Sequence, residues 1–227
     1  MLAELGKRIS DPRFVVASGN PELTKREHGV DSVHWQDVPA MVEAIAACNL
    51  VIIGGGGLFH DYWGVESAHV LSRLHYGIAF CSTPAVLASL HAKPIMIYGV
   101  GVGPLETKEG RQLTRAVFGL ADAATVRDQE SARLLEGLGL SRDRITVVPD
   151  PAFATPAPNP DDVGRARERI DEAGSGRVLG LCLRAWQVGT DQSRWLPAVI
   201  EAVDGCASDH SAHVVAVPCS DLDEEDT

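Results

Sequence analysis

The feature that most constrains the fold is an alternation of short, β-rich apolar runs with helical stretches along the 227-residue chain. Short apolar strands separated by helices are typical of a parallel sheet with helices on its faces. The sequence therefore predicts an α/β fold built on a doubly wound, Rossmann-like parallel sheet. Strands are expected at 13–18, 50–53, 94–98, 124–126, 145–148, 178–183 and 213–217, and helices at 38–48, 67–90 (with a break at Pro84 left open), 108–120, 129–138, 162–173 and 195–208.

A proline-rich segment at 148–161, VPDPAFATPAPNPD, divides the pattern. Proline fits poorly inside a helix or a central strand, so an extended linker is expected here. We predict a first Rossmann-like α/β domain at 1–158 and part of a second α/β domain at 159–227. Only two strands are expected after the linker. At the front, a short amphipathic helix opens the chain where a doubly wound fold would normally place a strand first.

Composition excludes several function classes. The chain has 31 Asp and Glu against 20 Lys and Arg, a net charge of −11, which argues against a general nucleic-acid binder. There is no apolar run long enough for a transmembrane helix and no signal-peptide core, so a cytoplasmic location is expected. The five cysteines lack CxxC spacing and are interpreted as reduced thiols, and the histidines form no HxH or HExxH pair, so neither a metal nor a cofactor is predicted.

The stretch VIIGGGGLFHDYWG, residues 51–64, is the first candidate site. Glycines at the end of a parallel strand lie at the edge where such sheets bind ligands, although a tight structural turn is the competing explanation. It matches neither a dinucleotide fingerprint nor a Walker loop. We predict ligand-facing glycines, His60 and Asp61 as catalytic acid/base residues, and the rings of Tyr62 and Trp63 as a platform for a sugar. The glycines are Gly54, Gly55, Gly56 and Gly57.

A second glycine-rich loop is expected after Tyr98, in YGVGVGPLET, where Gly101 and Gly103 would lie beside the first loop. Arg127 follows another strand, and it either pairs with the helix cap Asp128 or faces the ligand. Asp150, between two prolines, is assigned a structural role in the linker. Arg184, at the end of a strand in the second part, is placed to bind a carboxylate or phosphate.

These segments in this order resemble the polysaccharide pyruvyl transferase family. The segments that carry the resemblance are GGGGLFHDYWG, KPIMIYGVGVGPL, ADAATVRDQESARLLEGLG, VVPDPAF and LGLCLRAW. The resemblance implies a GT-B-like fold and transfer of a pyruvate-ketal group from phosphoenolpyruvate to a sugar of a cell-wall or exopolysaccharide unit. It also implies that Arg184 binds the donor, while His60, Asp61, Gly101, Gly103 and the run Gly54–Gly57 line the site from the first domain.

The sequence departs from the family pattern at both ends, where the first strand with its Gly-Asp turn and a later Arg-Leu-His segment are not found. Two alternatives therefore stay open: a nucleotide-sugar glycosyltransferase of the same architecture, and a catalytically inactive fragment or interaction subunit. The expected partners are phosphoenolpyruvate and a sugar or lipid-linked saccharide. Peripheral membrane association and oligomerisation are left open.

Overall fold

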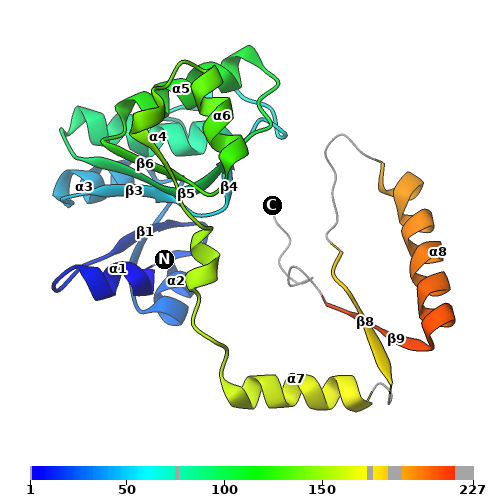
Figure 1. Ribbon diagram of the computed structural model, residues 1–227. Helices are drawn as coiled ribbons and strands as arrows, with labels where there is room; N and C mark the ends of the chain where they lie inside the picture. Colours follow the sequence, from blue (N-terminus) through cyan, green and yellow to red (C-terminus); the bar gives the residue numbers. More distant parts are fainter. Residues whose placement is uncertain (1, 75–76, 173–175, 184–190, 218–227) are drawn as a thin grey trace. The chain divides into compact units, whose positions relative to one another are not determined.

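The structure, a computed structural model, describes residues 2–74, 77–172, 176–183 and 191–217 (Figure 1). It consists of two compact units, Met1–Thr155 and Pro156–Thr227. The division falls inside the proline-rich segment, three residues before the end predicted for the first domain.

A parallel sheet forms the centre of the first unit. Its strands run in the order β3 (Val51–Gly54), β5 (Ile95–Val102), β6 (Ala123–Val126) and β7 (Ile145–Val147), and every pairing is parallel. A short strand β4 (Gly57–Phe59) pairs with the second half of β5, continuing where β3 ends. The predicted α/β class with a parallel sheet is confirmed, and β5, the longest strand, carries the centre of the apolar core.

Four helices pack on this sheet: α3 (Val38–Ala47), α4 (Gly77–Leu90), α5 (Lys108–Leu120) and α6 (Gln129–Gly137). In Figure 1, α4, α5 and α6 are grouped above the strands. Three of the helices begin at side-chain caps, as their sequences suggest: Asp37, Thr107 and Asp128 each accept a hydrogen bond from a backbone amide three residues on. Short 3₁₀ turns η1 (Ser67–His69), η2 (Arg142–Arg144) and η3 (Pro151–Ala154) complete the connections.

The unit begins with two helices and a separate two-stranded parallel sheet. The elements are α1 (Leu2–Arg8), β1 (Val15–Ser18), α2 (Pro21–His28) and β2 (Asp31–His34), and β1 pairs with β2. The sequence analysis did not predict α2 or β2. The signals for α2 were present, because Asn20 caps it, Pro21 stands at its start and Gly29 ends it in the left-handed conformation.

Two predicted elements differ from the structure. The expected helix at 67–90 is confined to η1 and to α4, which starts at Gly77 and includes Pro84. The hydroxyls of Ser82 and Thr83 bond back to carbonyls in the preceding turn, and most of α4 is buried, so packing offsets the amide that proline lacks. The loop expected after Tyr98 is instead strand, since β5 continues to Val102.

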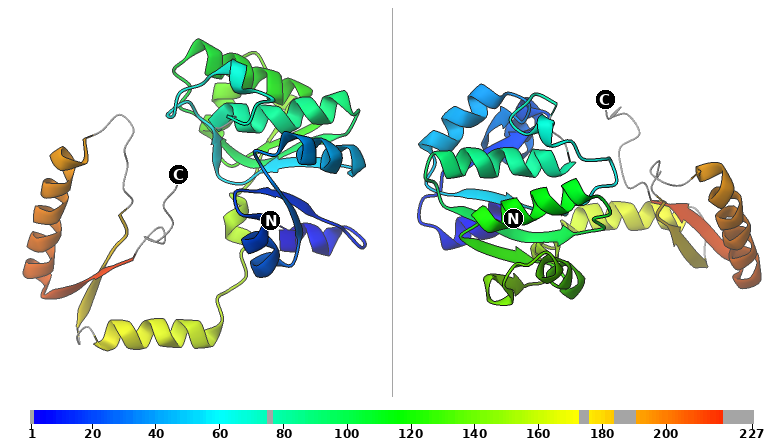
Figure 2. Two further views of the ribbon diagram at one scale, coloured as in Figure 1. Left: turned by 180° about the vertical axis from the view of Figure 1, so that it is seen from behind. Right: turned by 90° about the horizontal axis from the view of Figure 1, so that it is seen from above.

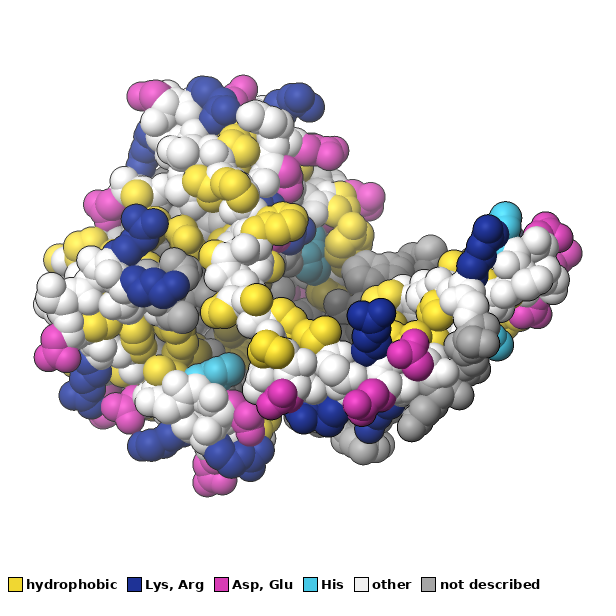
Figure 3. Space-filling model, turned by 60° about the horizontal axis from the view of Figure 1, so that its bottom comes forward, with side chains coloured by type: hydrophobic (Ala, Val, Ile, Leu, Met, Phe, Trp, Pro, Cys, Tyr) yellow, Lys and Arg dark blue, Asp and Glu magenta, His cyan; other side chains and the backbone are white. Residues whose placement is uncertain are grey.

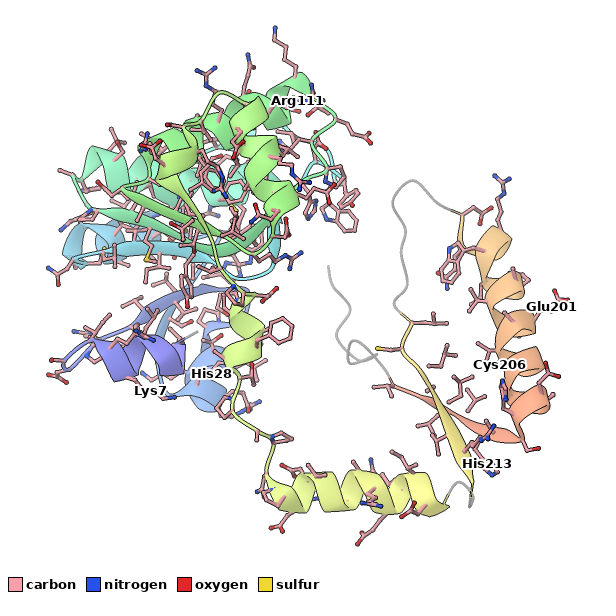
Figure 4. The ribbon with its side chains drawn as sticks, viewed as in Figure 1. Lys7, His28, Arg111, Glu201, Cys206 and His213 are labelled. Atoms are coloured by element: carbon pink, nitrogen blue, oxygen red, sulfur yellow. The ribbon has the colours of Figure 1, made fainter. Side chains whose placement is uncertain are left out.

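The second unit contains α7 (Pro160–Glu172), β8 (Arg177–Leu181), α8 (Gln192–His210) and β9 (Ala212–Ala216), and β8 pairs with β9 in parallel. Figure 4 labels Glu201 and Cys206 on α8 and His213 on β9. Both expected strands and both expected helices are present. In the described part of this unit no side chain is fully buried.

No helix among the described residues is long and apolar enough to cross a lipid bilayer. On the face drawn in Figure 3, acidic and basic side chains are interspersed, and neither sign forms a continuous patch there. Figure 2 shows the same chain from behind and from above, where the strands of the first unit lie among its helices.

Candidate functional site

The glycine run after β3 lets the chain stay beside β5. Gly55 and Gly56 have φ of 94° and 70°, a region that glycine reaches without strain, and they form the turn between β3 and β4. The amide of Gly101 then donates to the carbonyl of Gly56 at 2.9 Å, and that of Gly103 to Phe59 at 2.7 Å. Gly57 and Gly101, predicted to lie in loops, therefore lie on paired strands, and both predictions of a loop are wrong in this respect.

The group that approaches this bare backbone is the side chain of Arg127, from the end of β6. A Cβ atom placed on Gly101 would stand 2.7 to 2.9 Å from three atoms of the guanidinium group. On Gly57 it would stand 3.5 Å from one of its nitrogens, an ordinary contact. The guanidinium group thus lies over both strands. Of these two glycines, only Gly101 has no room for a side chain.

Arg127 is held there by Asp150. One guanidinium nitrogen donates to Oδ2 of Asp150 at 3.1 Å, while Asp150 Oδ1 accepts from the amide of Ala152. The hydrogen bond from the Ala152 amide has the larger effect on the pKa of Asp150, and Arg127 adds to it. Both lower the pKa, so Asp150 is ionised at neutral pH. Asp150 thus has the structural role that was predicted for it, and it also fixes an arginine, which the sequence analysis did not foresee.

The structure places Arg127 beside the helix cap Asp128 and also at a pocket; whether it faces a ligand stays a prediction. Asp128 caps α6 through the amide of Ser131 at 2.7 Å, and its other oxygen lies 3.7 Å from Arg127 Nε. The Arg127 side chain nonetheless stays 36% exposed and lines a pocket of about 270 Å³. The pocket lies between the end of β5 and the start of α6, and its lining residues are Gly101, Val102, Gly103, Pro104, Arg127, Asp128, Glu130, Ser131 and Leu134.

His60 stands directly after β4, and it is half-buried. Its ring is 4.7 Å from that of Tyr62, and Nδ1 is buried with no hydrogen-bond partner among the described residues. Burial lowers the pKa of His60, and the charge of Asp61 offsets only part of that effect. The imidazole is therefore neutral at pH 7 and able to accept a proton. The backbone amide of Asp61, the residue after His60, donates a hydrogen bond to the carbonyl of Pro104, and Pro104 lines the pocket.

Asp61 is 9% exposed and is occupied by structural hydrogen bonds. Its two oxygens accept from the amides of Glu106 and Thr107 and from the Thr107 hydroxyl, at 2.7 to 3.0 Å. Burial alone would raise the pKa of Asp61, but these hydrogen bonds outweigh it and lower the pKa. Asp61 thus fixes the loop after β4 to the start of α5, and its predicted catalytic role stays a prediction.

A second contact anchors the same loop. The Glu109 carboxylate accepts from the amide of Ser67 at 2.7 Å. Within the segment before α5, Arg111, labelled in Figure 4, donates to the carbonyl of Leu105. Tyr62 and Trp63 are 40% and 49% exposed in this anchored loop. The structure therefore presents both predicted aromatic residues to solvent from a fixed loop.

The remaining predicted residues are placed as follows. Gly54 ends β3, and Gly103, with φ of 103°, precedes Pro104 at the pocket. Arg184, the predicted donor-binding residue, lies outside the described residues. Within the described ranges, no group of three or more His, Cys, Asp or Glu side chains is placed to hold a metal ion.

The sequence analysis missed Glu130 and Ser131 as pocket residues. Ser131 is buried, and its hydroxyl accepts from the amide of Val102, which joins α6 to the end of β5. Both residues follow the capped start of α6, so the signal was a helix that begins at the ligand-binding edge of the sheet.

Known proteins were compared with the chain. Two crystal structures of Alr3699/HepE from Anabaena resemble it, one in complex with UDP-glucose (9% identity, 91% of this chain, TM-score 0.49) and one with UDP (10% identity, 92% of this chain, TM-score 0.48). The chain spans 61% of the first of these proteins and 69% of the second. No curated protein sequence matches it significantly. The family model of the polysaccharide pyruvyl transferases matches residues 1–199, and the chain therefore belongs to that family.

Proposed function

We propose that this protein transfers a pyruvate-ketal group from phosphoenolpyruvate to two hydroxyls of a sugar in a cell-wall or exopolysaccharide unit. Family membership supports the reaction class. The observation that carries the assignment to this site is His60, a neutral imidazole whose buried Nδ1 has no hydrogen-bond partner among the described residues. The amide of the adjacent Asp61 bonds to Pro104, which lines the pocket together with Arg127.

The proposed chemistry needs one base and one acid. His60 accepts the proton of the first sugar hydroxyl as its oxygen bonds to C2 of phosphoenolpyruvate, and a proton is added to the methylene carbon, which becomes a methyl group. The second hydroxyl then adds to C2, its proton leaves, and the C–O bond to phosphate breaks. The products are the cyclic ketal and inorganic phosphate, so no oxidant and no cofactor is consumed.

The donor carries a carboxylate and a phosphate, both of which suit arginine. We assign that role to Arg184 on sequence grounds. The acceptor, a free or lipid-linked saccharide, is assigned to the first unit, with Tyr62 and Trp63 offering ring faces and Arg127 a hydrogen-bond donor. A cytoplasmic location belongs to the same proposal, because phosphoenolpyruvate is a metabolite of that compartment.

The test is turnover of the full chain with phosphoenolpyruvate labelled with ¹³C at C3 and a panel of methyl hexosides, followed by NMR. The expected result is a new ketal methyl signal with an equal amount of phosphate. His60→Gln should abolish the signal, whereas His28→Gln, at the exposed end of α2, should not. Absence of the ketal with every acceptor, or full activity of His60→Gln, would reject the proposal.

The nucleotide-sugar glycosyltransferase is the second candidate from the sequence. The likeness to Alr3699/HepE is too distant to favour it. The same experiment separates the two functions, because a glycosyltransferase would leave phosphoenolpyruvate unconsumed.

A further inference from the structure

We propose that residues 62–74, which join β4 to α4, form a membrane-contact loop whose side chains enter the interface of a lipid bilayer (Figure 1). The partner is a lipid surface and not another protein. The inference goes beyond the proposed function and does not depend on the reaction proposed above.

Large apolar side chains of this loop face solvent. Leu74 is 63% exposed and Leu71 42% exposed, and Tyr62 and Trp63 are exposed to a similar extent. Tyrosine and tryptophan suit the boundary between water and lipid, because each has an apolar ring and a group that can hydrogen-bond. Leucine adds apolar surface that lipid can cover. The composition of the exposed side chains is therefore that of an interfacial segment.

The backbone at Leu71 shows that this exposure is built into the fold. Its φ of 63° lies in the left-handed region, which is uncommon for a bulky residue. The amide of Leu71 donates to the hydroxyl of Thr83 at 3.1 Å, and Thr83 is fully buried in α4. Such conformations persist only where the surrounding structure holds them, and they concentrate at functional sites. The core of the first unit thus holds a turn that exposes a leucine.

The hydrogen bonding of the loop favours lipid over a protein partner. Lipid chains offer no hydrogen-bond acceptors, so a segment that enters them must satisfy its own backbone amides. A protein partner would not require this, because it could supply the acceptors itself. Most amides of the loop donate within the protein, namely those of Gly64, Ser67, His69, Val70, Leu71, Ser72 and Leu74.

The loop is also closed at its base. A Cβ atom placed on Gly77, the first residue of α4, would stand 3.9 Å from the carbonyl oxygen of Gly64, so the chain returns to the point where it left. The Ser67 amide is tied to Glu109 in the first turn of α5. A closed loop fixed to two packed helices can enter a surface without unfolding.

The charges of the loop predict how binding responds to salt. Glu66 and Arg73 have opposite charges and are the loop's Asp, Glu, Lys or Arg residues. Arg73 is exposed, and an arginine beside leucines can lay its stem along acyl chains while the guanidinium reaches a lipid phosphate. The whole chain carries a net charge of −11, which opposes approach to an anionic membrane. Apolar contact must therefore carry the binding, and added salt should not weaken it.

The test is flotation of the full chain with vesicles of equal parts phosphatidylcholine and phosphatidylglycerol, at low and at high salt. We expect the protein to float with the vesicles, and the bound fraction not to fall at high salt. Trp63 reports on depth. Lipid brominated in its acyl chains should quench more fluorescence in the unmodified chain than in Trp63→Phe.

Two variants assign the binding to the loop. Leu71→Asn combined with Leu74→Ser removes both leucines, and asparagine adopts the left-handed conformation more readily than leucine, so the fold should not lose stability. We expect vesicle affinity to fall about tenfold. Leu90→Ser is the matched control, because Leu90 is 73% exposed at the end of α4, outside the loop, and its loss should leave affinity unchanged.

The outcomes separate this inference from the proposed function. Vesicle binding that the double variant loses supports the inference even if no ketal forms, in which case the proposed function alone fails. Absence of flotation overturns the inference, as does an unchanged affinity in the double variant or equal quenching in Trp63→Phe. Self-association that the double variant abolishes, without vesicle binding, would also overturn it, because the loop would then contact a second copy of the chain.

Discussion

The two units of the chain are built from the same kinds of element but bury their side chains to different extents. In the first unit, β5 and its neighbours enclose a continuous apolar core that includes Phe59, Ile97 and Val126, all with no exposed surface. In the described part of the second unit, strands β8 and β9 pair as regularly, yet Val178 and Val214 remain 43% and 41% exposed. Backbone pairing alone therefore does not indicate how much apolar burial stabilises a region.

This contrast locates the candidate site. The pocket, Arg127 and His60 are all held by the well-buried unit, on strand ends fixed by hydrogen bonds to Asp150 and Asp61. Rigid placement of polar groups over a packed core is what a binding site requires. Four matched comparisons test this contrast. Each sets one residue of the first unit against one residue of the second unit.

Cysteine reactivity should show the largest difference. Burial raises the pKa of Cys81 from 9.0 to about 12, which lowers its thiolate fraction about a thousandfold. Cys206 in α8 is exposed. Iodoacetamide labelling of the native protein, read by peptide mass spectrometry, should modify Cys206 readily and Cys81 only on unfolding. Comparable labelling rates would show that the first unit opens far more easily than its packing indicates.

Truncation of a strand valine should come next. Val126→Ala removes two buried carbons from β6 and should lower the free energy of unfolding by about 2–3 kcal/mol. Val214→Ala in β9 should cost less than about 0.5 kcal/mol, because that side chain is already partly in solvent. Hydrogen exchange of amides in β5 and β8 measures each unit separately. Equal costs would contradict the difference in burial.

Loss of the hydrogen-bonded Asp61 carboxylate should have a smaller and pH-dependent effect. The folded-state pKa of Asp61 is lowered, so its stabilisation is present above the ordinary aspartate pKa of 3.8 and is lost as pH falls through the folded value. Asp61→Asn should cost about 1–2 kcal/mol at pH 7 and flatten the acid dependence of stability.

The counterpart of Asp61 is Asp191, which caps α8 from an exposed position and whose pKa is lowered mainly by the hydroxyl and amide of Ser193. Asp191→Asn should leave stability nearly unchanged, since asparagine caps a helix as well as aspartate does. Thermal unfolding between pH 2.5 and 7 gives both results. A large effect of Asp191→Asn would contradict the comparison.

A glycine pair should show the smallest effect on stability. Gly101→Ala would bring a Cβ within 2.7 Å of the Arg127 guanidinium, so the arginine must move. We expect a loss of about 1 kcal/mol or less, with a clear weakening of hexoside binding. Gly180→Ala in β8 meets no atom within 4 Å and should be neutral or slightly stabilising. Unchanged binding in Gly101→Ala would show that Arg127 is not needed in its observed position.

The sequence by itself determined the alternation of strands and helices, the helix caps at Asp37, Thr107 and Asp128, and the concentration of glycines at one edge of the sheet. These features follow from local chemistry: residue periodicity, the hydrogen-bonding reach of a short polar side chain, and the backbone freedom of glycine. The short elements α2, β2 and β4 escaped prediction because a few residues carry too little periodicity to register.

Only the tertiary structure decided what the polar residues at that edge do. Asp61 bonds to Glu106 and Thr107, 45 and 46 residues away, contacts that no local pattern in the sequence indicates. Asp150 meets Arg127 across 23 residues, and Arg127 lies over Gly101, so the reason for that glycine is a guanidinium group from another strand. Such partners are set by which strands pair, and a linear sequence does not specify that pairing.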